Sequence, residues 1–217
     1  MLHKETVTPG TLELLKSLMQ DENLNDFFLV GGTALSLQIG HRASIDIDLF
    51  SQNPFDENQM LSYLESQKNL QLDYLAKNTI KGQIAQTKVD LITHPYPLVK
   101  ELEKHEGIRL ASLEDIAAMK LNAIVGNGTR LKDFIDIAFM SAYVPLKKMV
   151  DSYEDKYATR NPLMTLKALS YHNDINFNEP IQMVNGTYSW KVIEKRLSEM
   201  EKFPSLIFDT VPFAKKK

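Results

Sequence analysis

The sequence has 217 residues, enough for one large domain or two small ones, and its 43% hydrophobic and 24% charged residues are ordinary for a globular protein. It contains no cysteine, which excludes disulfides and thiolate chemistry. The net charge of −3 excludes an overall basic field that would draw nucleic acid, although a local basic patch can be sufficient for binding.

The N-terminal region predicts a helix and shows no sign of a targeting segment. Residues 1–10 lack the apolar stretch of a secretion signal, and no run in the chain approaches the ~20 apolar residues of a membrane span. We therefore expect a cytoplasmic protein with no membrane partner. Leucines at helical spacing predict the first helix over residues 11–20, and Thr8-Pro9-Gly10 is its start signal.

Residues 27–50 carry the strongest functional signal in the chain. The apolar run at 27–30 predicts a strand, which ends at Gly31 and Gly32. Glycines allow the backbone to bend and to approach a ligand closely. A helix that begins near Thr33 would point its free N–H groups and the positive end of its dipole at a phosphate. The segment is therefore interpreted as an anion-binding turn.

The next apolar run, residues 45–50, predicts a second strand that contains two acids. Side chains alternate along a strand, so Asp46 and Asp48 would share one face. By the same alternation, the apolar residues would point into the core: Ile45, Ile47 and Leu49. Two carboxylates beside an anion-binding turn repel each other unless a cation lies between them, and oxygen ligands select a hard ion. We infer Mg²⁺, with its coordination completed by phosphates and water.

The middle of the chain predicts a sheet. A helix is expected over residues 57–67, with Asp56 as its N-cap, followed by three short strands between residues 70 and 92. Gly82 indicates a bend inside the second of these strands. With the two earlier strands they would make a small mixed sheet. Residues 98–110 are expected to form a helix followed by a short extended segment.

Composition then changes to an all-helical pattern. Ser112 begins a capping box for a helix that ends at Gly126-Asn127-Gly128. Further helices are predicted over 130–143, about 145–157, about 162–172 and about 188–201. The predicted fold class is α+β: a small mixed sheet flanked by helices, followed by an all-helical C-terminal half. The expected domains are residues 1–110 and 111–217.

Two motifs carry a resemblance to a known family. Gly31-Gly32, thirteen intervening residues and then Asp46-Ile47-Asp48 resemble the signature of the DNA polymerase β-type nucleotidyltransferase superfamily. Within it, GGTAL followed by HRxSxDIDLF is similar to the AbiEii/AbiGii toxin family. The resemblance covers about residues 27–140, and it implies that the mixed sheet is a nucleotidyltransferase core.

The resemblance also implies a third acid on a neighbouring strand. Asp90, between two apolar residues, matches that place and would complete a metal-binding triad with Asp46 and Asp48. Two Mg²⁺ ions held by the triad would bind the attacking and leaving oxygens of the reaction. Asp90 would also help to take the proton of the acceptor. The alternative is an aspartate exposed on an edge strand.

A later pair of motifs, KxxAI followed by KDFIDI, resembles the region of this family that approaches the nucleotide. By this resemblance Lys120 would contact the triphosphate, and Asp133 or Asp136 would be the acid of the last motif; the sequence does not say which. Arg42 would neutralise phosphate or hold the aspartates, and His41 is expected at the surface. The alternative is that Lys120 is exposed and the two acids serve only the helix dipole.

The implied activity is transfer of a nucleoside monophosphate. An NTP would bind with its phosphates across Gly31-Gly32-Thr33, and an acceptor would attack the α-phosphorus and release pyrophosphate. The family resemblance implies the toxin of a two-gene bacterial toxin–antitoxin or phage-defence system, with an antitoxin as a partner. The alternatives are transfer to a protein or a small molecule, and a non-catalytic nucleotide-binding or partner-binding module. All three acids are present, which argues against the non-catalytic alternative.

The sequence is compatible with more than one acceptor. Related members of the family add nucleotides to tRNA ends, and a tRNA acceptor would require a basic face. The C-terminal helices offer candidates for it: Lys147, Lys148, Lys156, Arg160 and Lys167. The alternative is an ordinary solvated helix face. Other chemistries lack their motifs, because the five histidines are scattered and neither a GxxxxGK[ST] phosphate loop nor a GxSxG elbow occurs.

Overall fold

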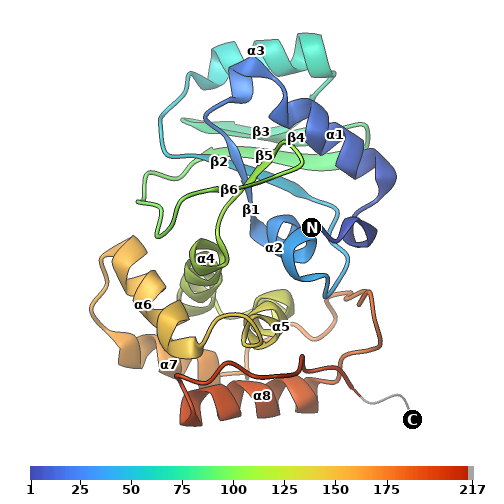
Figure 1. Ribbon diagram of the computed structural model, residues 1–217. Coiled ribbons are helices and arrows are strands. Elements are labelled where there is room, and N and C mark those ends of the chain that lie inside the picture. Colours follow the sequence, from blue (N-terminus) through green and yellow to red (C-terminus); the bar gives the residue numbers. More distant parts are fainter. Residues whose placement is uncertain (215–217) are drawn as a thin grey trace. The chain divides into compact units, whose positions relative to one another are not determined.

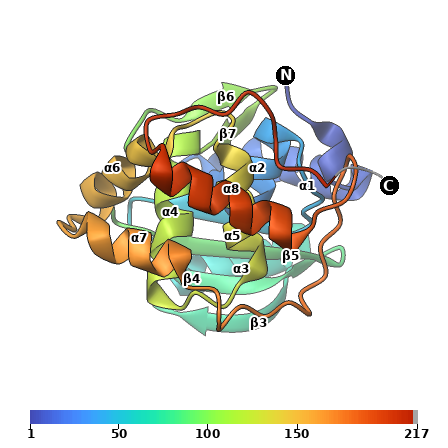
Figure 2. The same cartoon turned by 90° about the horizontal axis from the view of Figure 1, so that it is seen from below.

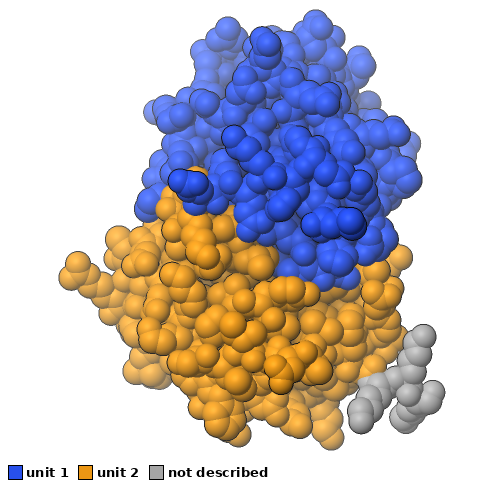
Figure 3. All heavy atoms as spheres, in the orientation of Figure 1, with its two compact units in different colours: residues 1–40, 44–97, 101–111 blue, residues 41–43, 98–100, 112–217 orange. Residues whose placement is uncertain are grey.

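A computed structural model describes residues 1–214 and divides the chain into two units, which Figure 3 colours separately. Unit 1 comprises residues 1–40, 44–97 and 101–111. Unit 2 comprises residues 41–43, 98–100 and the chain from residue 112 onward. Two short segments of the N-terminal half therefore belong with the C-terminal helices.

Unit 1 is built around a mixed sheet (Figure 1). Within residues 1–214 the sheet has seven strands in the order β3-β4-β5-β2-β1-β7-β6. The strands are β1 Phe28–Val30, β2 Ile47–Ser51, β3 Gln71–Ala76, β4 Thr79–Ile84, β5 Thr87–Thr93, β6 Glu103–His105 and β7 Ile108–Leu110. The pairs β2/β5 and β1/β7 are parallel, and the other neighbouring pairs are antiparallel. The predicted mixed sheet is confirmed.

The central strands place Asp48 on one face of the sheet and a set of fully buried apolar side chains on the other. In β2, buried Ile47 and Leu49 alternate with half-buried Asp48 and Phe50. Successive side chains of a strand point to opposite faces, so the apolar residues line the core while the acid stands on the other face. The same core contains fully buried residues from the neighbouring strands: Leu29, Ile80, Val89 and Leu91.

The helices of unit 1 begin at local signals in the sequence. They are α1 Pro9–Met19, α2 Gly31–Ile39 and α3 Glu57–Lys68, with short 3-10 turns at Lys4–Thr6 and Glu22–Leu24. The hydroxyl of Thr8 accepts the N–H of Thr11 at the start of α1, and the carboxylate of Asp56 accepts two N–H groups at the start of α3. Both predicted caps are confirmed, because a cap depends only on residues within one turn.

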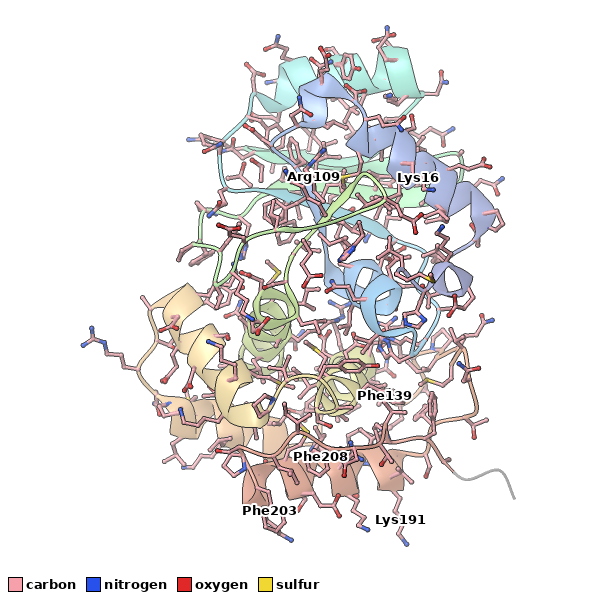
Figure 4. All side chains as sticks on the ribbon, in the orientation of Figure 1. Lys16, Arg109, Phe139, Lys191, Phe203 and Phe208 are labelled. Atoms are coloured by element: carbon pink, nitrogen blue, oxygen red, sulfur yellow. The ribbon has the colours of Figure 1, made fainter. Side chains whose placement is uncertain are left out.

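The helix expected in residues 98–110 is absent from the structure, and this prediction was wrong. The segment forms a hairpin of β6 and β7, turned at Glu106 and Gly107 with φ of +52° and +83°. A hairpin turn with positive φ at both central residues matches the twist of its strands, and glycine favours it. Arg109, labelled in Figure 4, extends from β7 and donates hydrogen bonds to the carbonyl oxygens of Met19, Leu24 and Phe27.

Regular structure in the described part of unit 2 consists of helices, in agreement with the prediction of an all-helical C-terminal half. They are α4 Leu113–Gly126, α5 Leu131–Met140, α6 Leu146–Tyr157, α7 Pro162–Ser170 and α8 Trp190–Lys202. Ser112 caps α4 as predicted, by accepting the N–H of Asp115. Figure 2 shows α8 passing across α5 and beside α7. None of the described helices is long and apolar enough to span a bilayer.

Candidate active site

Two of the predicted acids face each other in the sheet of unit 1. The parallel strands β2 and β5 pair with Asp48 directly opposite Asp90. Register partners on neighbouring strands point to the same face, so the two carboxylates stand side by side. Asp48 is half-buried and Asp90 is buried. The local cause is the apolar pattern, which buries Ile47, Leu49, Val89 and Leu91 on the opposite face.

The third predicted acid lies apart from the strand. The strand begins at Ile47, two residues later than expected, and Asp46 lies exposed in the irregular segment before it. Ile45 is 61% exposed, so the prediction that it points into the core was wrong. Within residues 1–214 no three acid, histidine or cysteine side chains gather closely enough to hold a metal ion. The predicted triad is therefore present in this structure as a pair, Asp48 and Asp90.

The glycine turn lies against this pair. Gly31 has a φ of +71° and is already the first residue of α2, so the helix begins two residues earlier than predicted. A Cβ at Gly31 would overlap Oδ2 of Asp48 and lie 3.2 Å from its Cγ. The N-cap of α2 is Val30, whose side chain makes no cap hydrogen bond, and the first turn also contains Gly32. The absence of a side chain at Gly31 is what lets the helix start beside the carboxylate.

Thr33 has a different role from the one predicted. Its side chain is completely buried, and its hydroxyl hydrogen-bonds to the carbonyl oxygen of Asp46 and, at 2.9 Å, to the hydroxyl of Ser44. These bonds satisfy the hydroxyl internally. The expectation that phosphates bind across Gly31-Gly32-Thr33 is corrected for the Thr33 side chain, which instead holds the segment before β2 in place.

Asp90 has an uneven set of partners. Its Oδ2 lies 2.8 Å from the Lys81 ammonium and 3.7 Å from that of Lys88. Its Oδ1 is buried and has no hydrogen-bond partner among the described residues. A buried carboxylate oxygen without a donor is rare and costs free energy, because it has lost water without replacement. The alternative of an exposed edge-strand aspartate is wrong, since Asp90 is only 4% exposed and β5 is an internal strand.

A second group of charges lies in unit 2. The Arg42 guanidinium binds Asp136 in a bidentate manner, with Nε 2.7 Å from Oδ1 and Nη2 2.8 Å from Oδ2. The Lys120 ammonium lies 2.7 Å from Oδ2 of Asp136 and 2.7 Å from Oδ1 of Asp133. All four side chains are buried. The alternative of an exposed Lys120 and acids that serve only the helix dipole is therefore wrong.

The charges in this group stabilise one another. Burial alone would raise the pKa of Asp136, but the charges of Arg42 and Lys120 hold that pKa well below its usual value. Burial alone would lower the pKa of Lys120, but Asp136 and Asp133 raise it. Two cations and two carboxylates thus form one network, and its charges favour the ionised forms of Arg42, Lys120 and Asp136.

His41 joins the same network, contrary to the expectation of a surface residue. It is 2% exposed, and its Nε2 lies 2.8 Å from Oδ1 of Asp136. Burial lowers the pKa of His41 more than the neighbouring Asp136 raises it. The ring therefore stays neutral inside unit 2, where it packs against Phe139 at 5.4 Å between centroids.

The predicted basic face also changes in the structure. Lys156 is buried, and its ammonium lies 2.9 Å from Oδ1 of Asp115, so it is not part of a basic surface. Asp115 also accepts the N–H groups of Val99 and Lys100, which explains why residues 98–100 belong to unit 2. The other cations of the set keep at least partial exposure: Lys147, Lys148, Arg160 and Lys167.

Lys81 is the site residue that the sequence did not reveal. The only signal was its place in the alternation of TIKGQI, where it stands among apolar residues of β4. Its position opposite Asp90 depends on the register of β4 on β5. That register follows from the turn at Ala85 and Gln86, both with positive φ.

Comparison with known proteins places this arrangement in a family. The family described as "Nucleotidyl transferase AbiEii toxin, Type IV TA system" matches residues 13–69 and 70–202. The chain belongs to the AbiEii family. An uncharacterized protein of Aquifex aeolicus (strain VF5) is 32% identical over 168 residues, which are 75% of this chain and 81% of that protein. The family resemblance stated from the motifs is confirmed.

The fold comparison agrees with the family. The crystal structure of a candidate nucleotidyltransferase from H. pylori is similar with a TM-score of 0.57 and 17% identity, over 91% of this chain and 96% of that chain. This likeness supports the α+β fold with a mixed sheet and a helical C-terminal half. By its family the AbiEii chain is a nucleotidyltransferase, and its general reaction class is nucleoside monophosphate transfer.

Proposed function

We propose that this AbiEii protein transfers a nucleoside monophosphate from an NTP to an acceptor with release of pyrophosphate, as the Mg²⁺-dependent toxin of a bacterial toxin–antitoxin or phage-defence system. The observation that carries the proposal is the placement of Asp48 opposite Asp90, beside a helix that begins at Gly31. The family match supports the reaction class and suggests the toxin role by its description.

The residues of unit 1 fit a divalent metal ion. Mg²⁺ is usually held by one or two carboxylates and completed by substrate phosphates and water, so the pair of Asp48 and Asp90 is sufficient. The buried Oδ1 of Asp90 has no hydrogen-bond partner among the described residues, and a cation would satisfy it. The resemblance adds Asp46 as a third ligand and a second ion. When bound, Mg²⁺ would withdraw charge from the α-phosphate and neutralise the departing pyrophosphate.

The protein groups then have the following roles. The N–H groups of the first turn of α2, at Gly31 and Gly32, bind phosphate oxygens through the positive end of the helix. An acceptor oxygen attacks the α-phosphorus, a new P–O bond forms, and the bond to the bridging oxygen of pyrophosphate breaks. Asp90 accepts the proton that leaves the acceptor hydroxyl. The Thr33 hydroxyl keeps Asp46 in place by donating a hydrogen bond to the backbone carbonyl of Asp46.

The proposal also gives the cations of unit 2 a share in binding the nucleotide, as the resemblance implies. Lys120 and Arg42 would interact with the triphosphate. Asp133 and Asp136 both contact the Lys120 ammonium, so they would act as positioning residues that orient these cations. This assignment covers both acids between which the motif did not distinguish.

For the acceptor we propose the end of a tRNA, with transfer to a protein or a small molecule as the rival. Lys147, Arg160 and Lys167 are exposed in unit 2 and offer phosphate contacts. An antitoxin partner belongs to the same proposal. A non-catalytic nucleotide-binding module is the candidate of another class, and the ionisable pair of Asp48 and Asp90 argues against it.

The test is to incubate the protein with each α-labelled NTP, Mg²⁺ and either bulk tRNA or cell protein. Label on RNA supports the proposed acceptor, label on protein supports the rival, and no label with any acceptor supports the non-catalytic module. Asp48→Asn should lower labelling on the order of 10³-fold, because charge neutralisation by metal ions contributes several kcal/mol. The matched control is Asp73→Asn, an exposed acid on β3 of the same unit, which should keep full labelling.

A further inference from the structure

The Lys81 ammonium contacts Asp90, one of the two acids of the proposed metal-binding pair. It lies directly opposite Asp90 in the antiparallel pairing of β4 with β5, and Asp90 lies directly opposite Asp48 in the parallel pairing of β5 with β2. Register partners share a face, so Lys81, Asp90 and Asp48 form one row across three strands. The ammonium is thus built into the same face as the two acids.

The two side chains of the Lys81–Asp90 ion pair differ strongly in burial. The carboxylate of Asp90 is 5% exposed, whereas the Lys81 side chain is 37% exposed. A mostly buried carboxylate needs a cation, because ionised groups lose their hydration in the interior. The lysine can leave that position with little loss of packing, since its stem is flexible and reaches water. Lys81 is therefore a counter-ion that is easily removed from an acid that cannot itself move to water.

The two carboxylate oxygens of Asp90 have different surroundings. Oδ2 takes the Lys81 ammonium at 2.8 Å, while Oδ1 is buried and has no hydrogen-bond partner among the described residues. One monovalent cation therefore satisfies only half of the carboxylate. A divalent ion could satisfy both oxygens and the neighbouring Asp48, which is the arrangement that hard cations prefer.

The geometry points to Lys81 as an internal counter-ion that a divalent metal ion must displace from Asp90 in order to bind. Lys81 is a positioning residue: its ammonium holds the Asp90 carboxylate in place in the metal-free protein, and it sets the metal affinity of the pair. This inference rests on the proposed function, because it takes Asp48 and Asp90 as metal ligands. The alternative is an ordinary cross-strand ion pair that has no bearing on metal binding.

The test measures Mn²⁺ binding to the free protein by electron paramagnetic resonance, with no nucleotide and no reaction. Lys81→Met should bind Mn²⁺ at least about fivefold more tightly than the wild type, because the charge-assisted hydrogen bond to Asp90 no longer has to be broken. Lys81→Arg keeps the charge and should return the affinity to near the wild-type value. In a thermal unfolding experiment, saturating Mn²⁺ should raise the Tm of Lys81→Met more than that of the wild type.

Lys88→Met is the matched control, because it removes the same charge near the same oxygen. The Lys88 ammonium is 3.7 Å from Oδ2 of Asp90 and its side chain is 50% exposed, so it does not hold the carboxylate as Lys81 does. Its removal should change Mn²⁺ affinity by less than about twofold. An equal gain in both variants would show a general effect of charge and would overturn the displacement, as would an unchanged affinity in Lys81→Met.

Asp48→Asn separates this inference from the proposed function. If Asp48→Asn weakens Mn²⁺ binding but Lys81→Met leaves the affinity unchanged, the metal site stands and the counter-ion role is wrong. If Asp48→Asn has no effect on Mn²⁺ binding in either the wild-type or the Lys81→Met background, the metal part of the proposed function fails, and the inference fails with it.

Discussion

Asp136 of unit 2 and Asp90 of unit 1 are both buried, but they differ in how completely their carboxylate oxygens are bound by other side chains. In unit 2, both oxygens of Asp136 are bound by buried cations, Arg42 and Lys120, with His41 as a further partner. In unit 1, buried Asp90 has one oxygen on a half-exposed lysine and the other without a hydrogen-bond partner among the described residues. A carboxylate with all its partners is part of the fold, whereas one that lacks partners is available to a ligand.

This difference explains which substitutions should harm stability and which should harm chemistry. Breaking a buried ion pair leaves an uncompensated charge and costs about 3–5 kcal/mol. Removing a charge that the fold does not satisfy costs little stability and can even relieve repulsion. Substitutions in the two units should therefore have effects of different size and kind.

The largest effect is expected from Asp136→Asn. The amide keeps the shape of the side chain but removes the carboxylate that binds both Arg42 and Lys120. The free energy of unfolding should fall by about 3–5 kcal/mol, measured by urea denaturation. The control Asp151→Asn removes an exposed partner of Lys147 and should cost less than about 0.5 kcal/mol. A loss below about 1 kcal/mol for Asp136→Asn would contradict the view that this network stabilises unit 2.

The next effect concerns the glycine turn. Gly31→Ala places a Cβ against the Asp48 carboxylate at a φ of +71°, which costs about 1–2 kcal/mol in backbone strain. Because the carboxylate must move, nucleotidyl transfer should fall by about tenfold to 100-fold, on the order expected for misplacement of a reacting group by about 1 Å. The readout is the rate of NTP-dependent labelling. Gly10→Ala is the control, since a Cβ there meets no atom within 4 Å. Equal rates for both variants would show that a side chain at Gly31 does not displace the Asp48 carboxylate from a reactive position.

A smaller effect is expected from pH. Burial lowers the pKa of His41 from its ordinary value of 6.5, so the unfolded chain takes up a proton at a pH where the folded protein does not. Stability should therefore decrease as the pH falls below about 6.5, toward the lower pKa of the folded state. His41→Gln, whose amide can still donate to Asp136, should flatten the fall of Tm with pH. His105→Gln, at a partly exposed site of the other unit, is the control substitution.

The smallest effect is expected at the surface of α6. Lys147→Met removes an exposed i,i+4 pair with Asp151 and should change the free energy of unfolding by less than about 0.5 kcal/mol. Lys156→Met, on the same helix, leaves the buried carboxylate of Asp115 without its cation and should cost several times more. Similar unfolding curves for the two variants would remove the distinction between the exposed lysine and the buried one.

The sequence alone determined the features that depend on residues close together in the chain. The caps at Thr8, Asp56 and Ser112 could be read because each one acts within a single helical turn. The apolar runs predicted strands and helices by their period. The spacing of Gly31-Gly32 and Asp46-Ile47-Asp48 indicated the superfamily, and the segments GGTAL and HRxSxDIDLF indicated the family, since all of these residues lie within 31–50.

The tertiary structure decided everything that depends on contacts between distant segments. His41 and Lys156 were expected at the surface, but acids far along the chain, Asp136 and Asp115, draw them into the interior. The contact of Lys81 with Asp90 depends on strand register, because a shift of one residue would turn Lys81 to the opposite face of the sheet. Local propensity reports the shape of a segment, whereas burial and charge pairing are properties of the neighbours that folding supplies.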